Sequence, residues 1–129
     1  MRKIIISALI LLVLDSVFIY IMNPIFQSQI FDVQKSPLRI NRLPAIACYV
    51  ILIFALNYFI LQKRRSILDA FLLGVVIYGV YETTSFALLR NWRLTTVIID
   101  TLWGGSLFAL TTYFTYLFTM TFSQKYLIR

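Results

Sequence analysis

The sequence contains no histidine, a single cysteine and only five acidic residues among 129. Without histidine, the chain lacks the commonest general base and the most common transition-metal ligand. Cys48 has no second cysteine for an internal disulfide, and its apolar surroundings favour a packing role over thiol or zinc chemistry. Neither a Walker-type phosphate loop nor a GxSxG serine elbow occurs. We therefore expect no enzymatic activity, no cofactor and no metal.

Charge is also scarce, while apolar residues are abundant. Charged residues make up 13% of the chain and hydrophobic residues 60%, whereas soluble domains have about 25% charged and about 45–50% apolar residues. The net charge is +7, but a nucleic-acid binder gathers its basic residues on one solvated face. Here they lie in short clusters between apolar runs, as at membrane boundaries. The bilayer is thus the expected surrounding, and nucleic acid is not an expected partner.

Four apolar runs cover residues 4–22, 45–61, 67–89 and 95–118. Each is close to the roughly 20 residues that cross a ~30 Å hydrocarbon core as a helix. Strands of a membrane barrel would be about half as long and would alternate polar with apolar residues, which no run does. The sequence therefore predicts an all-α polytopic integral membrane protein. Its 129 residues form one domain, a bundle of four transmembrane helices.

The connection after the first run is the only long one. Asn23-Pro24 is expected to close the first helix, and residues 23–43 are expected to form a loop. This loop either contains a short helix lying on the membrane surface or is irregular. Arg2-Lys3 before the first run resembles a signal peptide, but Asp15 interrupts the run and no small-x-small cleavage site follows. We expect an uncleaved first helix.

The distribution of positive charge predicts the orientation. Seven Lys and Arg residues lie with the N-terminus, the second loop and the C-terminus, and five lie in the first and third loops. Because cytoplasmic loops carry the excess of positive residues, both termini are expected on the cytoplasmic side or its organellar equivalent.

Three of the five acids, Asp15, Glu82 and Asp100, fall inside predicted spans, where each charge costs about 2.5–3.5 kcal/mol on insertion scales. Asp15 and Glu82 each lie seven residues before the outer end of their helix, and Asp100 lies five residues inside the fourth helix. At about 1.5 Å per residue, all three lie roughly 8–10 Å below the same surface. The sequence therefore predicts that three carboxyl groups share one layer.

Residues three or four positions apart share a helix face, so the acids have predictable neighbours. On these faces lie hydrogen-bonding residues and glycines, which allow close helix packing. The predicted polar cluster comprises Asp15, Tyr78, Tyr81, Glu82, Ser85, Asp100 and Trp103. In one interpretation, the acids are hydrogen-bonded and only fix helix packing. In the other, they bind a proton, a cation or a polar headgroup.

Arg90 and Arg93 flank the short link between the third and fourth runs, and Trp92 between them suits an anchor at the headgroup level. As functional residues, the two arginines would pair with Asp100 or Glu82, or hold a lipid phosphate. The alternative is that both are ordinary boundary residues whose stems snorkel to the membrane surface.

The residues around these acids carry a resemblance to a known family. They are Leu14-Asp15, Tyr78-Gly79-Val80-Tyr81-Glu82-Thr83-Thr84, Leu88-Leu89-Arg90-Asn91-Trp92 and Asp100-Thr101-Leu102-Trp103-Gly104. In order and spacing the chain resembles the small bacterial membrane proteins of domain of unknown function 2177. It departs from their pattern at Glu82, where the family has Asp, and at Ser85, where it has Asn. The resemblance implies four spans and a membrane location, and no activity.

Two functions are compatible with these features. The first is a structural or accessory membrane subunit that packs against other subunits or against copies of itself, because the chain has no sizeable extramembrane part and its helices are rich in aromatic residues. The second is a proton- or cation-linked carrier, or a lipid-headgroup-binding protein, built around the three intramembrane acids. Since four spans are few for a transport path, the carrier would need an oligomer.

Overall fold

The computed structural model describes residues 1–119. Within them, four helices are long and apolar enough to cross a membrane, which confirms the predicted all-α membrane fold. They are α1 (Arg2–Gln34), α2 (Arg42–Leu56) with its continuation η1 (Asn57–Leu61), α3 (Ile67–Leu88) and α4 (Leu94–Thr119). The predicted boundary residues Lys125 and Arg129 lie outside the described residues.

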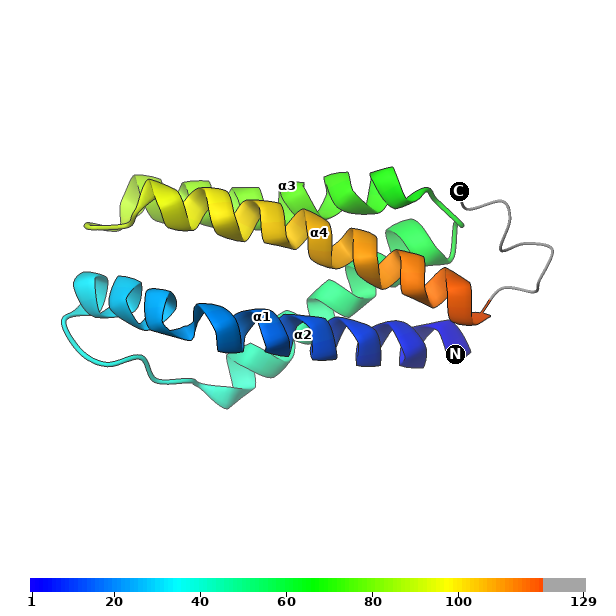
Figure 1. The fold of residues 1–129 in the computed structure, drawn as a ribbon, viewed down its shortest axis with the longest axis horizontal. Coiled ribbons are helices and arrows are strands. Elements are labelled where there is room, and N and C mark those ends of the chain that lie inside the picture. The colour runs from blue at the N-terminus through cyan, green and yellow to red at the C-terminus, as the bar shows by residue number, and fades with distance from the viewer. Residues whose placement is uncertain (120–129) are drawn as a thin grey trace.

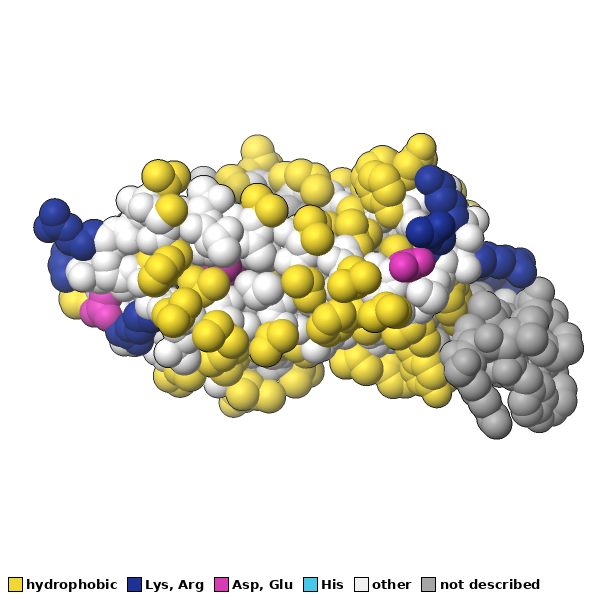
Figure 2. All heavy atoms as spheres, turned by 90° about the horizontal axis from the view of Figure 1, so that it is seen from above, with side chains coloured by type: hydrophobic (Ala, Val, Ile, Leu, Met, Phe, Trp, Pro, Cys, Tyr) yellow, Lys and Arg dark blue, Asp and Glu magenta, His cyan; other side chains and the backbone are white. Residues whose placement is uncertain are grey.

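The helices are arranged as an elongated bundle (Figure 1). α3 and α4 form a close antiparallel hairpin, α1 runs alongside α4, and α2 crosses the others obliquely. The N-terminus and the α2–α3 connection lie at one end, and the α3–α4 turn and the end of α1 lie at the other. Hydrophobic side chains cover much of the length of the face in Figure 2, with Lys and Arg gathered at the two ends. This is the surface expected of a chain that spans a bilayer.

Glycines explain how closely α3 approaches α4. A Cβ atom added to Gly74 would lie 2.2 Å from the backbone oxygen of Gly104, and one added to Gly104 would lie 2.2 Å from the ring of Tyr78. No larger residue fits at either position without displacing the neighbouring helix. The hairpin that carries Glu82 and Asp100 is therefore held in register by backbone contact.

α1 is longer than the sequence predicts. It continues through Pro24 and ends at Lys35, which adopts the left-handed conformation with φ 60° and donates its amide to the Phe31 carbonyl. The expected loop over residues 23–43 is therefore wrong, because its first part is helix and only the remainder connects to α2. Proline removes one helical hydrogen bond, but the side chains beyond it bind the α3–α4 turn and offset that loss.

The last turn of the second span is a π-helix, η1. Its first residue, Asn57, donates from Nδ2 to Ser7 Oγ on α1 at 3.0 Å and to the Ile53 carbonyl at 2.9 Å. Further along the bundle, the Tyr116 hydroxyl of α4 donates to the Arg65 carbonyl at 2.7 Å. These bonds attach α2 and the α2–α3 loop to α1 and α4 near the N-terminal end of the bundle.

Candidate functional site: three carboxyl groups of the helix bundle

Asp15 is the first acid of the layer, and it joins three helices. It lies on α1 with 6% of its surface exposed. Its Oδ2 accepts from the Tyr49 hydroxyl of α2 at 2.5 Å, and its Oδ1 accepts from the Trp103 indole nitrogen of α4 at 2.9 Å. The Trp103 ring also stacks on Phe18 of α1, with centroids 4.4 Å apart and planes within 3°. Both carboxyl oxygens therefore have a donor from another helix, which offsets the cost of burial.

Glu82 is buried on α3, with 2% of its surface exposed. Its Oε1 accepts from the Trp92 indole nitrogen at 3.0 Å. Trp92 lies in the α3–α4 connection and is itself buried, so its ring packs inside the bundle and does not face the surroundings. The indole points into the bundle, because leaving the buried Glu82 carboxyl group without a donor would cost more free energy than the ring would gain at the membrane interface.

Asp100 lies on α4, and its carboxyl group is close enough to those of Glu82 and Asp15 for their charges to interact. Two neighbouring carboxyl groups can share one proton, which then forms a hydrogen bond between them. Among residues 1–119, no three His, Cys, Asp or Glu side chains converge as metal ligands.

The structure brings most of the predicted polar cluster together. Tyr78 lies within charge range of Asp15 and Asp100, with its ring against Gly104. Ser85, four residues beyond Tyr81 on α3, is buried, and the ring of Tyr81 meets Trp92 edge to face at 6.4 Å between centroids. The ring of Tyr81 is 58% exposed and faces the surroundings of the bundle. Tyr78 therefore lies inside the layer and Tyr81 on its rim.

Arg93 does not join the carboxyl layer. Its Nη2 pairs with Asp32 of α1 and also donates to Ser28 Oγ at 3.0 Å. Pairing of Arg93 with Asp100 or Glu82, considered above, is therefore not what the structure shows. Arg90 is exposed in the same turn, and no ion pair of Arg90 occurs within residues 1–119. Within residues 1–119, neither Arg90 nor Arg93 therefore forms an ion pair with Asp15, Glu82 or Asp100.

Gln29 of α1 explains why the end of the bundle closes over Glu82. It is 1% exposed, and its Nε2 donates to the Asn91 carbonyl at 2.9 Å. Its Oε1 accepts from the Arg93 amide at 2.9 Å and from Thr96 Oγ1 at 3.0 Å. Together with the Arg93–Asp32 pair, these bonds form a polar latch between the end of α1 and the α3–α4 turn, and the turn carries Trp92.

Sequence reasoning missed Tyr49, Trp92 and Gln29 as partners of this region. Tyr49 lies seven residues inside α2 from Arg42, and so at about 10 Å from its start. This depth could have indicated Tyr49 as a partner of Asp15. Nothing in the sequence indicated Trp92 or Gln29, because both fall in segments that were predicted to be loops.

The family model described as "Predicted membrane protein (DUF2177)" matches residues 1–117. The chain belongs to this family. The match covers all four helices up to Leu117, including the three acids, Tyr49 and Trp92. No curated protein and no solved structure matches the chain. Family membership thus establishes that the chain is a membrane protein, and it assigns no role to the three carboxyl groups.

Proposed function

We propose that this member of the DUF2177 family is a small proton-linked membrane carrier whose proton-binding site is the Glu82–Asp100 pair. The observation that carries the proposal is the proximity of these two carboxyl groups, one of which, Glu82, is 2% exposed. We propose that the pair binds a proton when the two carboxyl groups are in contact and releases it when they separate. Asp15, whose charge acts on Asp100 from the opposite helix, makes a second ionised acid in the layer costly.

A buried hydroxyl group on Thr101, the residue that follows Asp100 in the sequence, supports this function. Thr101 Oγ1 is buried and has no hydrogen-bond partner within residues 1–119. A buried hydroxyl normally has one, so this group is available to a water molecule or to a polar group of a substrate. Because four helices are few for a transport path, we propose that the carrier works as a homo-oligomer with both termini in the cytoplasm.

Infrared spectroscopy tests the proton-binding site directly. The purified protein is expected to show the carbonyl band of a protonated carboxyl group, and this band is expected to disappear in Glu82→Gln and Asp100→Asn. Asp69→Asn is the control, since Asp69 is a half-buried acid of α3 that pairs with Arg65 at 3.0 Å. A spectrum without the band in the unchanged protein would exclude a shared proton.

Proton flux tests the carrier. Proteoliposomes with an internal pH dye, driven by a potassium gradient with valinomycin, are expected to take up protons faster than empty vesicles. Either Glu82→Gln or Asp100→Asn is expected to abolish the difference, and Asp69→Asn to keep it. Equal flux in all variants would leave the carboxyl layer with a packing role only.

One observation favours a second function, an accessory subunit that packs against other membrane components. Ile46, Val50, Phe54 and Tyr58 recur every four residues along α2 and η1, and their exposed fractions run from 46% to 61%. They form one stripe on the helix that crosses the bundle obliquely. Cysteines placed in this stripe in a Cys48→Ser background would cross-link in native membranes if a protein covers it. Failure to cross-link, together with an ordered monomer after purification, would exclude this function.

A further inference from the structure

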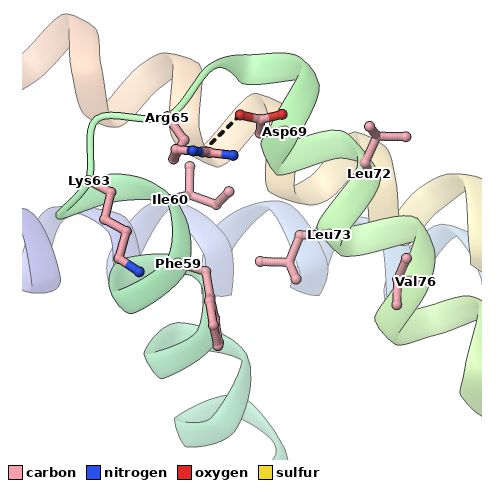
Figure 3. Close-up of a pocket in the computed structure, with 8 residues that line it drawn as sticks. All are labelled: Phe59, Ile60, Lys63, Arg65, Asp69, Leu72, Leu73 and Val76. Atoms are coloured by element: carbon pink, nitrogen blue, oxygen red, sulfur yellow. Dashed lines mark ion pairs between the residues drawn. The ribbon is translucent and has the colours of Figure 1, made fainter.

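A groove lies between η1 and the first half of α3, next to the α2–α3 loop (Figure 3). It has a volume of about 430 Å³, which is within the range of ligand sites. Its charged lining residues, Lys63, Arg65 and Asp69, lie near the α2–α3 loop, and its apolar lining continues along α3 to Val76. Since Val76 lies seven residues beyond Asp69, the apolar part extends about 10 Å along the helix.

The groove opens toward the surroundings of the bundle. Phe59, Leu72 and Val76 line it and are 48%, 51% and 59% exposed. In a bilayer these side chains face the acyl chains, and the charged residues at the loop lie at the headgroup level. The groove is thus apolar at the depth of acyl chains and charged at the depth of phosphates.

The charged end of the groove has an excess of positive charge. Arg65 Nε pairs with Asp69 at 3.0 Å, and the guanidinium keeps its other N–H groups for a second acceptor. The Lys63 ammonium lies 4.8 Å from the centre of the Tyr58 ring, and no acidic partner of Lys63 occurs within residues 1–119. Arg64 follows in the same loop, near enough to Lys3 for their charges to interact. Two cations and one carboxylate therefore line this end of the groove, and Arg64 lies in the same loop.

We propose that this groove binds an anionic phospholipid, with its phosphate at Lys63 and Arg65 and one acyl chain along Leu72 and Val76. Charge complementarity selects the phosphate, since basic pockets between membrane helices bind anionic headgroups. The apolar lining favours a lipid over a free anion, because only a lipid has an acyl chain that can cover the exposed apolar half of the groove. This site is separate from the proton pair and stands independently of the proposed function.

Native mass spectrometry of the protein in detergent, supplied with phosphatidylglycerol or phosphatidylcholine of identical acyl chains, tests the proposal. The unchanged protein is expected to retain phosphatidylglycerol about tenfold better. Lys63→Gln/Arg65→Gln is expected to lose this preference. The control Arg39→Gln/Arg90→Gln removes the same charge outside the groove and is expected to keep the preference. An equal loss in both double variants would overturn the proposal in favour of non-specific attraction.

The apolar half needs its own variant, since charge alone would also attract inorganic phosphate. Val76→Trp fills the groove and is expected to lower retention of both lipids without changing charge. Val80→Trp is the matched control, because Val80 is 62% exposed one turn further along α3 and does not line the groove. Unchanged lipid retention in Val76→Trp, or complete displacement of the lipid by inorganic phosphate, would overturn the assignment to a phospholipid.

Discussion

The indole nitrogen of Trp103 lies 2.9 Å from Asp15 Oδ1, and this bond joins residues 88 positions apart. With the Tyr49 hydroxyl on the other oxygen, it ties α1, α2 and α4 together at a single carboxyl group. The Glu82–Asp100 pair lies on the α3–α4 hairpin, so the three acids and the residues that contact them come from all four helices. A change of protonation there would act on the packing of the whole bundle.

Asp15→Ala is expected to lower the stability of the bundle by about 2 kcal/mol, because it leaves the Tyr49 and Trp103 donors without an acceptor. Asp15→Asn is the control. Its amide oxygen still accepts from Trp103, and its NH₂ group donates to the Tyr49 hydroxyl, which rotates to accept. Thermal unfolding in detergent, followed by the near-ultraviolet circular dichroism of the tryptophans, measures the difference. Equal loss in both variants would mean that the charge itself, and not the pair of hydrogen bonds, stabilises the bundle.

Gly74→Ala is expected to destabilise the α3–α4 hairpin by about 3 kcal/mol, since the added methyl group overlaps the Gly104 carbonyl. Gly79→Ala provides a control on the same helix. Its Cβ would meet only the Thr101 methyl group at 3.5 Å, and alanine favours the helix by about 0.5–1 kcal/mol. Chemical denaturation in mixed micelles is expected to rank Gly79→Ala at or above the unchanged protein. Equal midpoints for both variants would contradict backbone contact between α3 and α4.

That the three acids lie near one another could be predicted from the sequence, and so could Trp103 as a member of their cluster, but Tyr49 and Trp92 could not. The predicted depths used the rise per residue and the ends of the apolar runs, and the end used for Asp15 was Met22, whereas α1 continues to Gln34. A hydrogen bond also depends on how each helix is rotated about its axis, which short-range patterns do not determine for helices that are apolar all round. Tyr49 was therefore missed, although its depth matches that of Asp15.

The predicted end of α1 was wrong for a different reason. Local rules end a helix near Asn23-Pro24, because proline lacks an amide donor. Here tertiary hydrogen bonds outweigh that local cost. Gln29 alone makes three, two to the α3–α4 turn and one to Thr96 in the first turn of α4. No pattern within residues 23–34 indicates that the turn lies beside them, since the two segments are about 60 residues apart.

The polar latch gives a third prediction. Gln29→Ala is expected to cost about 2–3 kcal/mol, because it removes three largely buried hydrogen bonds. It is also expected to free the end of α1 from the turn. Hydrogen exchange of residues 23–34 should then accelerate far more than that of the rest of α1. The control is Gln27→Ala, whose side chain makes only an exposed bond to Asn23 at 3.2 Å. Uniform exchange along α1 in Gln29→Ala would contradict a separate latch.

Arg64 gives the last prediction, since it occupies a position that glycine would fill at lower cost. Its φ is 52°, in the left-handed region, where a side chain costs about 1 kcal/mol. Arg64→Gly is expected to be more stable than Arg64→Ala by about 1 kcal/mol, since only glycine relieves the strain while both remove the charge. Both variants are expected to bind phosphatidylglycerol more weakly than the unchanged protein does. Thermal unfolding with and without this lipid measures both effects, because a bound ligand raises the melting temperature. Equal lipid stabilisation of both variants and the unchanged protein would show that Arg64 is a turn residue only, and that its charge does not contribute to binding of the anionic lipid.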